Sequence, residues 1–275
     1  MIVLRLVCLL LIAAESMICA FASDEFLRVQ QGTLPIVISA PHGGSQSIPG
    51  AEERKGEALA KGASGFFTGR DTGTEELATE LARQLELRFD AKPCFVISRV
   101  HRRYVDFNRP PEIAVEHDKA RVVYDSYHTA LKDQCRIVRS RHSHGLLIDL
   151  HGQGTSAETV FRGTKNGITT TMLQKDFGTD ALFGGESLFG LLNHRGWKVH
   201  PDPLDGREQS GFTGGYIVQT YGSHRGDGLD AFQLEFGSSY RSGEARNKTA
   251  EVLADAIAEY SAKYLKIPAA AATVK

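Results

Sequence analysis

Two apolar runs of this sequence each end in a histidine followed by glycine, and histidine is the side chain that most often binds metals. One run ends in DLHG at 149–152 and the other in PHGG at 41–44. A neutral His151 can bind a metal ion, and Asp149, two residues earlier, can fix its tautomer. A histidine that is only hydrogen-bonded at a strand end is the alternative. Two such ends in one chain favour a shared metal site that includes His42.

An acidic residue is needed to complete a site with two histidines. Asp71 stands just before residues 75–89, whose leucines and alanines recur at helical spacing. Asp71 is either a helix cap or an oxygen ligand. Thr74, or a capping box of Thr72 and Glu75, could equally cap the helix. Glu75 and Glu76 compete with it for the ligand role.

A further glutamate lies in an apolar segment, where a charged side chain is costly unless it is paired or functional. Glu235 shares one face of residues 229–237 with Gln233. A salt bridge to an arginine would explain the presence of Glu235 in this segment without a catalytic role. The functional interpretation is a general base toward a water that a metal activates.

Residues 99–110 hold four arginines close to Asp106 and Asn108. A guanidinium binds a carboxylate through two hydrogen bonds and also stabilises an oxyanion. A solvated basic loop is the alternative interpretation.

The elements that would position these residues alternate between strands and helices. Apolar runs predict strands at 34–40, 94–98, 146–151, 197–200, 216–220 and 229–237, and short strands or a hairpin at 158–164 and 168–172. Helical spacing predicts helices at 75–89, 117–141, 186–194 and 245–266. Residues 45–70 are expected to form a long loop over the site, and the glycine-rich residues 201–215 a loop near its mouth. The pattern predicts a single α/β domain with a mixed, mostly parallel sheet and helices on both faces.

Composition bounds the class of protein. The chain has 275 residues, 41% of them hydrophobic, and 32 basic against 33 acidic residues, for a net charge of -1. This balance gives no basic surface for nucleic acid, and no uncharged apolar run is long enough to span a membrane. Cys94 and Cys135 either pair after export or remain buried thiols.

The N-terminus has the pattern of a signal peptide. Arg5 precedes a short apolar stretch at 6–14, and an A-x-A pattern at 20–22 predicts cleavage after Ala22. We therefore expect a signal peptide at 1–22, a mature domain at 23–275, and a secreted or periplasmic location.

Four motifs in a fixed order carry a resemblance to a known family. PHGG at 41–44, DTGT at 71–74, VDFNRP at 105–110 and DLHG at 149–152 resemble the N-formylglutamate amidohydrolase family. That family is related to the zinc carboxypeptidases and to the succinylglutamate desuccinylase and aspartoacylase group. The resemblance extends from His42 to Glu235, and it implies a hydrolase fold like that of the zinc peptidases.

The resemblance implies one zinc ion per chain, with His42, His151 and Asp71 as ligands. Asp71 matches the family's acidic residue before the helix, and it departs from the His-x-x-Glu spacing of the carboxypeptidases. Glu235 matches a late glutamate at a strand end, which makes it the expected general base. Asp149 is expected to orient a ligand histidine from behind.

The same resemblance gives roles to the arginine-rich segment. Asn108 and Arg109 resemble a pair that binds a substrate carboxylate. Arg102 matches the family's upstream arginine best by spacing and would stabilise the oxyanion, while Arg99 and Arg103 remain alternatives for these contacts.

The predicted function is a secreted zinc-dependent amidohydrolase. It would cleave an amide bond in a small carboxylate-bearing substrate, either an N-acyl amino acid such as N-formylglutamate or a short peptide. A non-catalytic zinc-containing binding protein on the same fold is the alternative. A serine hydrolase fits less well, because the sequence has no G-x-S-x-G motif and Ser45 has no predicted base beside it.

Overall fold

The structure is a computed structural model that describes residues 25–56 and 65–267, so the predicted signal peptide lies outside it. Its centre is a seven-stranded sheet with the strand order β1-β3-β2-β4-β7-β5-β6. The strands are β1 (Leu27–Gln30), β2 (Ile36–Ala40), β3 (Cys94–Ser98), β4 (Leu146–Gly152), β5 (Thr159–Gly163), β6 (Lys198–His200) and β7 (Asp230–Phe236).

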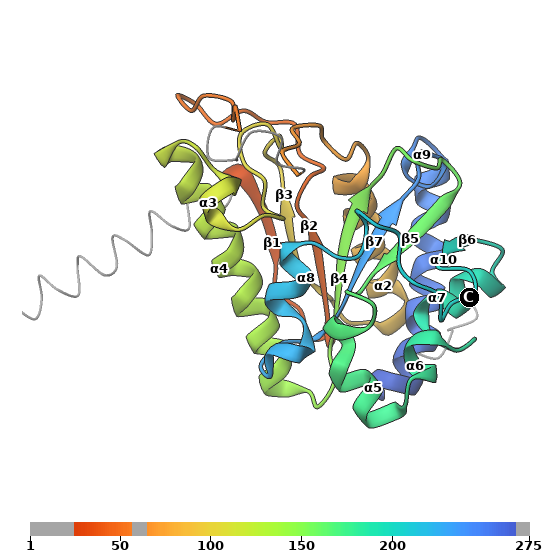
Figure 1. Cartoon of the computed structure of the whole chain (residues 1–275). Helices are drawn as coiled ribbons and strands as arrows, with labels where there is room; N and C mark the ends of the chain where they lie inside the picture. The colour runs from red at the N-terminus through yellow and green to blue at the C-terminus, as the bar shows by residue number, and fades with distance from the viewer. Residues whose placement is uncertain (1–24, 57–64, 268–275) are drawn as a thin grey trace, which may run out of the picture.

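The four central strands β3, β2, β4 and β7 run parallel to one another. β1 pairs antiparallel with β3, and β5 pairs antiparallel with β7. The prediction of a mixed, mostly parallel sheet is therefore confirmed. Because parallel strands end at one edge of a sheet, the carboxyl ends of β2, β4 and β7 lie together, at the upper side of the sheet in Figure 1.

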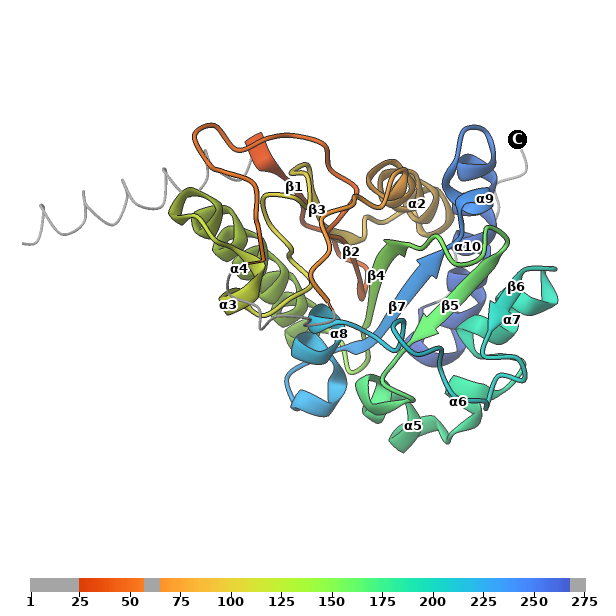
Figure 2. The same cartoon turned by 45° about the horizontal axis from the view of Figure 1, so that its top comes forward.

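Helices cover both faces of the sheet, as predicted. The main helices on one face are α2 (Thr74–Phe89), α7 (Leu188–His194) and α10 (Ala245–Tyr260), and on the other α4 (Asp118–Arg141) and α8 (Tyr216–Tyr221). Figure 2 shows α4 and α10 on opposite sides of the strands. Shorter elements are α3 (Pro111–Ala114), η1 (Ile168–Thr170), α5 (Thr171–Phe177), α6 (Asp180–Phe183), η2 (Ser223–Arg225), α9 (Ser238–Arg241) and η3 (Ser261–Leu265). No helix of the described ranges is long and apolar enough to cross a membrane.

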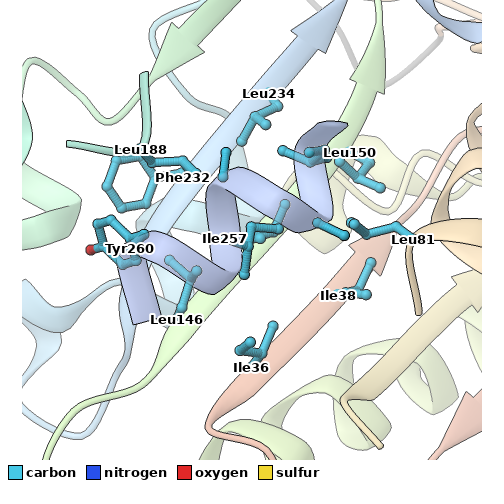
Figure 3. Packing of buried hydrophobic residues seen from close by; sticks show 14 of the residues in the cluster. Ile36, Ile38, Leu81, Leu146, Leu150, Leu188, Phe232, Leu234, Ile257 and Tyr260 are labelled. Carbon is cyan, nitrogen blue, oxygen red and sulfur yellow. The ribbon is translucent and has the colours of Figure 1, made fainter. Parts of the chain in front are cut away.

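Strand β4 shows how the sequence pattern divides the two faces. Leu146, Ile148 and Leu150 are fully buried in the core on the side of α2 and α10. Figure 3 shows Leu146 and Leu150 in this packing. Because side chains alternate along a strand, the residues between them face the side of α4 and α8. Those residues end in Asp149 and His151, so one strand supplies both packing and chemistry.

Three local predictions were wrong. Residues 216–220 form helix α8 rather than a strand, and 168–172 lie in η1 and the start of α5. Their β-branched and aromatic residues favour strands, but the backbone turns here instead, and Thr169 Oγ1 donates to Ala231 O of β7 at 2.6 Å. Helix α2 also has no side-chain cap, because its N-cap is Gly73 in a left-handed conformation (φ 90°).

The two cysteines of the predicted mature chain do not pair. Cys94 and Cys135 are buried free thiols.

Candidate metal centre and active site

Three elements bring the predicted metal ligands together. His42 follows β2, His151 is on β4 next to it in the sheet, and Asp71 stands before α2. Each side chain offers one ligand atom, and these atoms lie within 4.8 Å of one another. All three residues are buried. The competing acids Glu75 and Glu76 do not belong to this group, so Asp71 is the acid that the fold places beside the histidines.

The rear nitrogen of each imidazole is hydrogen-bonded to a carboxylate. His42 Nε2 lies 2.8 Å from Asp106 Oδ1, and His151 Nε2 lies 2.9 Å from Asp149 Oδ2. A ring that donates through Nε2 keeps the lone pair of Nδ1 for another partner. Both Nδ1 atoms face Asp71 Oδ2, at 3.5 Å for His42 and 3.2 Å for His151.

One ligand atom is left without a partner by the protein. His42 Nδ1 is buried and has no hydrogen-bond partner among the described residues, although a buried polar atom normally has one. A metal ion would supply the missing interaction. Two imidazole nitrogens and one carboxylate oxygen suit zinc, and they also accept other divalent ions.

Charges are strongly coupled at this centre. Burial alone would raise the pKa of Asp71, but its contacts with His151 and His42 outweigh burial and hold that pKa well below its ordinary value. Burial lowers the pKa of His151, but Asp149 and Asp71 outweigh it and raise that pKa well above normal. Asp71 is therefore ionised, as a ligand carboxylate must be.

Close backbone contacts fix the strand ends. Asp71 N donates to His42 O at 2.9 Å, and Gly152 N donates to Asp71 Oδ2 at 3.0 Å. Gly43 packs so closely on the start of α2 that a Cβ there would stand 2.3 Å from Glu75 N. Only glycine permits this approach, which explains why His42 is followed by glycine.

Arg102 is the arginine of the basic segment that reaches the centre. Its Nε and Nη2 donate to Asp106 Oδ2 at 3.0 and 2.8 Å, and its Nη1 lies 3.9 Å from Asp71 Oδ1. Arg103 is exposed and pairs with Glu53 at 3.0 Å. Within the described residues, the cavity lining includes Arg102 but neither Arg103 nor Arg99.

Glu235 stands beside His151 because the two residues are paired in the register of β4 and β7. Its carboxylate accepts a hydrogen bond from Gln233 Nε2 at 2.7 Å. Burial raises the pKa of Glu235 to about 7, a value at which a carboxyl group can both accept and return a proton near neutrality. Gln233 Oε1 in turn accepts from Gly215 N at 2.7 Å, so the loop before α8 is tied to this glutamate.

Asn108 and Arg109 both line the cavity above the candidate metal ligands, but they differ in how fully their side chains are hydrogen-bonded. Asn108 is buried, its Oδ1 accepts from Ile217 N at 2.8 Å, and its Nδ2 donates to Gln233 Oε1 at 3.3 Å. Arg109 is partly exposed, and its Nη1 donates to Asn108 O at 3.0 Å. Its Nε donates to Gly65 O at 3.4 Å, and no carboxylate of the described residues forms a salt bridge with Arg109, so its charge is available to an anionic ligand.

A cavity of about 790 Å³ opens above these residues. Its lining includes the four cationic residues Arg102, Arg109, Lys165 and Arg225, and the acidic residues Asp71 and Glu235. Residues 211–215 also line it, which agrees with the expectation that the loop at 201–215 lies near the mouth. The positive excess suits an anionic ligand.

Sequence reasoning gave no role to Asp106 or Gln233 in orienting the site. Each stands two residues before a residue that was singled out, Asn108 and Glu235 respectively. On a strand such as β7, that spacing places both side chains on one face, and this was the signal that could have indicated Gln233. Asp106 lies in a loop, where no such periodicity applies.

The fold is shared with a known hydrolase. N-formylglutamate amidohydrolase from Ralstonia eutropha JMP134 superposes with a TM-score of 0.56 at 16% identity, over 88% of this chain and 98% of that one. Weaker similarity connects the chain with a bacteriophage poly-gamma-glutamate hydrolase (TM-score 0.39, 12% identity, 86% and 89% coverage). The succinylglutamate desuccinylase from Chromobacterium violaceum is equally distant (TM-score 0.39, 14% identity, 83% and 62% coverage). No family model and no curated protein sequence matches the chain. The predicted hydrolase-like α/β fold is thus confirmed.

Proposed function

We propose that this protein is a zinc-dependent hydrolase that cleaves an amide bond in a small substrate with a free carboxylate. The observation that carries the proposal is the buried group of His42, Asp71 and His151, in which two rear carboxylates leave both Nδ1 atoms available. An N-acyl amino acid or a short peptide fits the description. The shared fold with an N-formylglutamate amidohydrolase supports the same class of reaction.

His42, Asp71 and His151 would hold the metal. Zinc bound there would act as a Lewis acid that lowers the pKa of water and polarises the acyl oxygen. The tautomers needed for binding are set by Asp106 and Asp149, which accept from the rear nitrogens. This arrangement is common behind histidine ligands.

Proton transfer is assigned to Glu235. Its carboxylate lines the cavity beside His151, and a pKa of about 7 lets it take a proton from the attacking water and deliver it to the leaving nitrogen. Gln233 holds one carboxylate oxygen and so fixes the direction of the other. Arg102 Nη1, the guanidinium nitrogen not bound to Asp106, would stabilise negative charge that develops on the acyl oxygen.

Substrate binding is assigned to the rim of the cavity. Arg109 has no salt bridge among the described residues and would bind the substrate carboxylate. Asn108 frames this position, because both ends of its amide are already hydrogen-bonded inside the protein. The predicted signal peptide supports a secreted or periplasmic location for this activity.

The test compares metal content and turnover in two variants. The wild-type chain should hold about one zinc per chain and cleave members of an N-acyl amino acid panel. His151→Ala should lose both the metal and the activity, whereas Glu235→Gln should keep the metal and lose at least about a hundredfold in kcat. A Glu235→Gln variant with unchanged turnover would remove the proposed mechanism. Zinc without turnover on any substrate would favour a non-catalytic binding protein.

A further inference from the structure

One exposed aromatic side chain lies inside the cavity. Phe67 is 55% exposed. The other exposed large apolar residues of the described ranges, Val29, Leu87, Val122 and Ile168, do not line this cavity. Single apolar residues on a surface need no explanation. An aromatic ring exposed beside a cluster of charged catalytic groups is different, because it presents apolar surface where a substrate must lie.

Phe67 is held in this position by buried contacts. Arg54 Nη2 donates to Phe67 O at 2.8 Å and to Arg102 O at 2.9 Å, so one buried guanidinium joins the two segments. The Phe67 ring lies 5.0 Å from Arg102 Cζ, within the range of a cation–π contact. The ring is therefore fixed to the arginine that faces the metal ligands.

A second aromatic group borders the cavity from the loop before α8. Phe212 lines it, and the Phe212 ring packs 4.9 Å from that of Phe161 on β5. Arg102, which stacks on the ring of Phe67, follows β3 in the chain. In the sheet, β3 and β5 lie on either side of β4 and β7, the strands of His151 and Glu235. Phe67 and Phe212 therefore supply aromatic surface to the cavity from two separate segments of the chain.

The size of the cavity agrees with this arrangement. Its volume of about 790 Å³ falls within the range of pockets that enclose drug-sized ligands, roughly 300–1,000 Å³. A formyl group would fill little of it and would leave Phe67 in contact with water. A larger apolar group would remove that ring from water at a gain in affinity.

We propose that the acyl group of the substrate is bulky and apolar and that it packs against Phe67. This inference rests on the proposed amide hydrolysis. It assigns the apolar group to the acyl side, because the ring stacks on Arg102, the residue proposed to stabilise the acyl oxygen. Arg109 Nε donates to Gly65 O at 3.4 Å, two residues before Phe67, so the substrate series must separate the acyl side from the amine side. The substrate carboxylate, on the amine side of the bond, belongs to Arg109. An N-acyl amino acid with an aliphatic chain or an aromatic acyl group meets these conditions.

The experiment measures kcat/KM of the zinc-loaded chain on one amino acid that carries formyl, acetyl, butanoyl, hexanoyl or phenylacetyl groups. We expect an increase toward the larger acyl groups, by up to about fourfold for each methylene that becomes buried. Phe67→Ala should flatten this dependence, and Phe67→Leu should retain most of it. The matched control is Leu87→Ala, a residue 64% exposed on α2, which should change nothing.

Two results would overturn the inference while the proposed function stands. One is equal or better cleavage of the formyl and acetyl substrates. The other is a selectivity that follows the amino-acid side chain, with Phe67→Ala acting on that dependence instead. If no substrate is cleaved, the proposed function fails and the acyl group has no substrate to belong to; calorimetric titration with hexanoate and formate then tests the apolar site at Phe67 separately. Hexanoate that binds no better than formate would contradict it.

Discussion

Asp106 contacts both the candidate metal ligand His42 and Arg102, so its substitution should affect metal binding and the position of this arginine. Its carboxylate is fully buried and accepts from His42 Nε2 at 2.8 Å, from Asn108 N at 3.1 Å, and twice from Arg102. Burial would raise its pKa, but His42 and Arg102 outweigh burial and hold that pKa well below normal. In Asp106→Asn, the amide oxygen can still accept from His42, while the new NH₂ group faces the guanidinium of Arg102.

These contacts give an expected magnitude. Loss of a partner behind a metal-bound histidine costs about 10- to 100-fold in metal affinity, or about 1.4–2.7 kcal/mol. Asp106→Asn keeps one acceptor and should lie near the tenfold end, whereas Asp106→Ala keeps none and should approach a hundredfold. Breaking the buried pair with Arg102 should also lower the free energy of unfolding of the metal-free protein by about 3–5 kcal/mol.

The assay is competition for zinc between the protein and a chromophoric chelator, with urea unfolding of the metal-free form in parallel. Asp255→Asn is the matched control, because its carboxylate is 54% exposed and pairs with Arg88 on the surface. It should change neither zinc affinity nor stability by more than about 1 kcal/mol. Zinc affinity of Asp106→Ala within twofold of wild type would refute the assignment of Asp106 behind His42.

Two further predictions concern stability. Glu208 is buried and accepts from Arg162 Nε at 3.1 Å and from Thr164 N at 2.9 Å, so Glu208→Gln should lower the free energy of unfolding in urea by about 3–5 kcal/mol. As the control, Glu186→Gln removes one charge of an exposed surface salt bridge and should lower the free energy of unfolding by less than about 1 kcal/mol. Equal effects of the two substitutions would contradict this account. Burial lowers the pKa of His128 to about 4, below the ordinary value near 6.5 of the unfolded chain, so the unfolded state binds the extra proton first as pH falls. The stability that depends on neutral His128 is therefore fully present above pH 6.5 and is lost as pH falls toward 4. This lowers the free energy of unfolding by at most about 3 kcal/mol. Denaturant titrations at pH 7 and pH 4.5 should show a smaller loss in His128→Gln than in wild type.

The sequence predicted the site best where local pattern and sheet topology determine position. His42 and His151 both end apolar runs, and parallel neighbours must end at one edge. Asp71 stands three residues before the start of α2 at Thr74, and this position made it a candidate ligand as well as a candidate cap. The structure places Asp71, rather than Glu75 or Glu76, beside the two histidines, in agreement with the DTGT motif at 71–74.

Long-range contacts account for what the sequence could not show. Helix α8 contains an YIVQT segment with strand-forming residues, yet it is a helix whose Ile217 N donates to Asn108, over a hundred positions earlier in the chain. The role of Asp106 depends on His42, which reaches it from the loop after β2, 64 positions earlier in the chain. No periodicity encodes such contacts, because they arise only when the sheet has formed.

The register of β4 against β7 connects stability with chemistry. Asp149 pairs with Gln233, and His151 pairs with Glu235. Because side chains alternate with a period of two, a slip by one residue would turn these polar groups into the core beneath α10 and bring leucine and phenylalanine to the site. The buried Asp149 is satisfied by Ser39 Oγ at 2.7 Å, from β2 on its other side. The cost of burying polar residues is thus offset only in the register that also assembles the site, and selection for folding and for function would then act on the same residues.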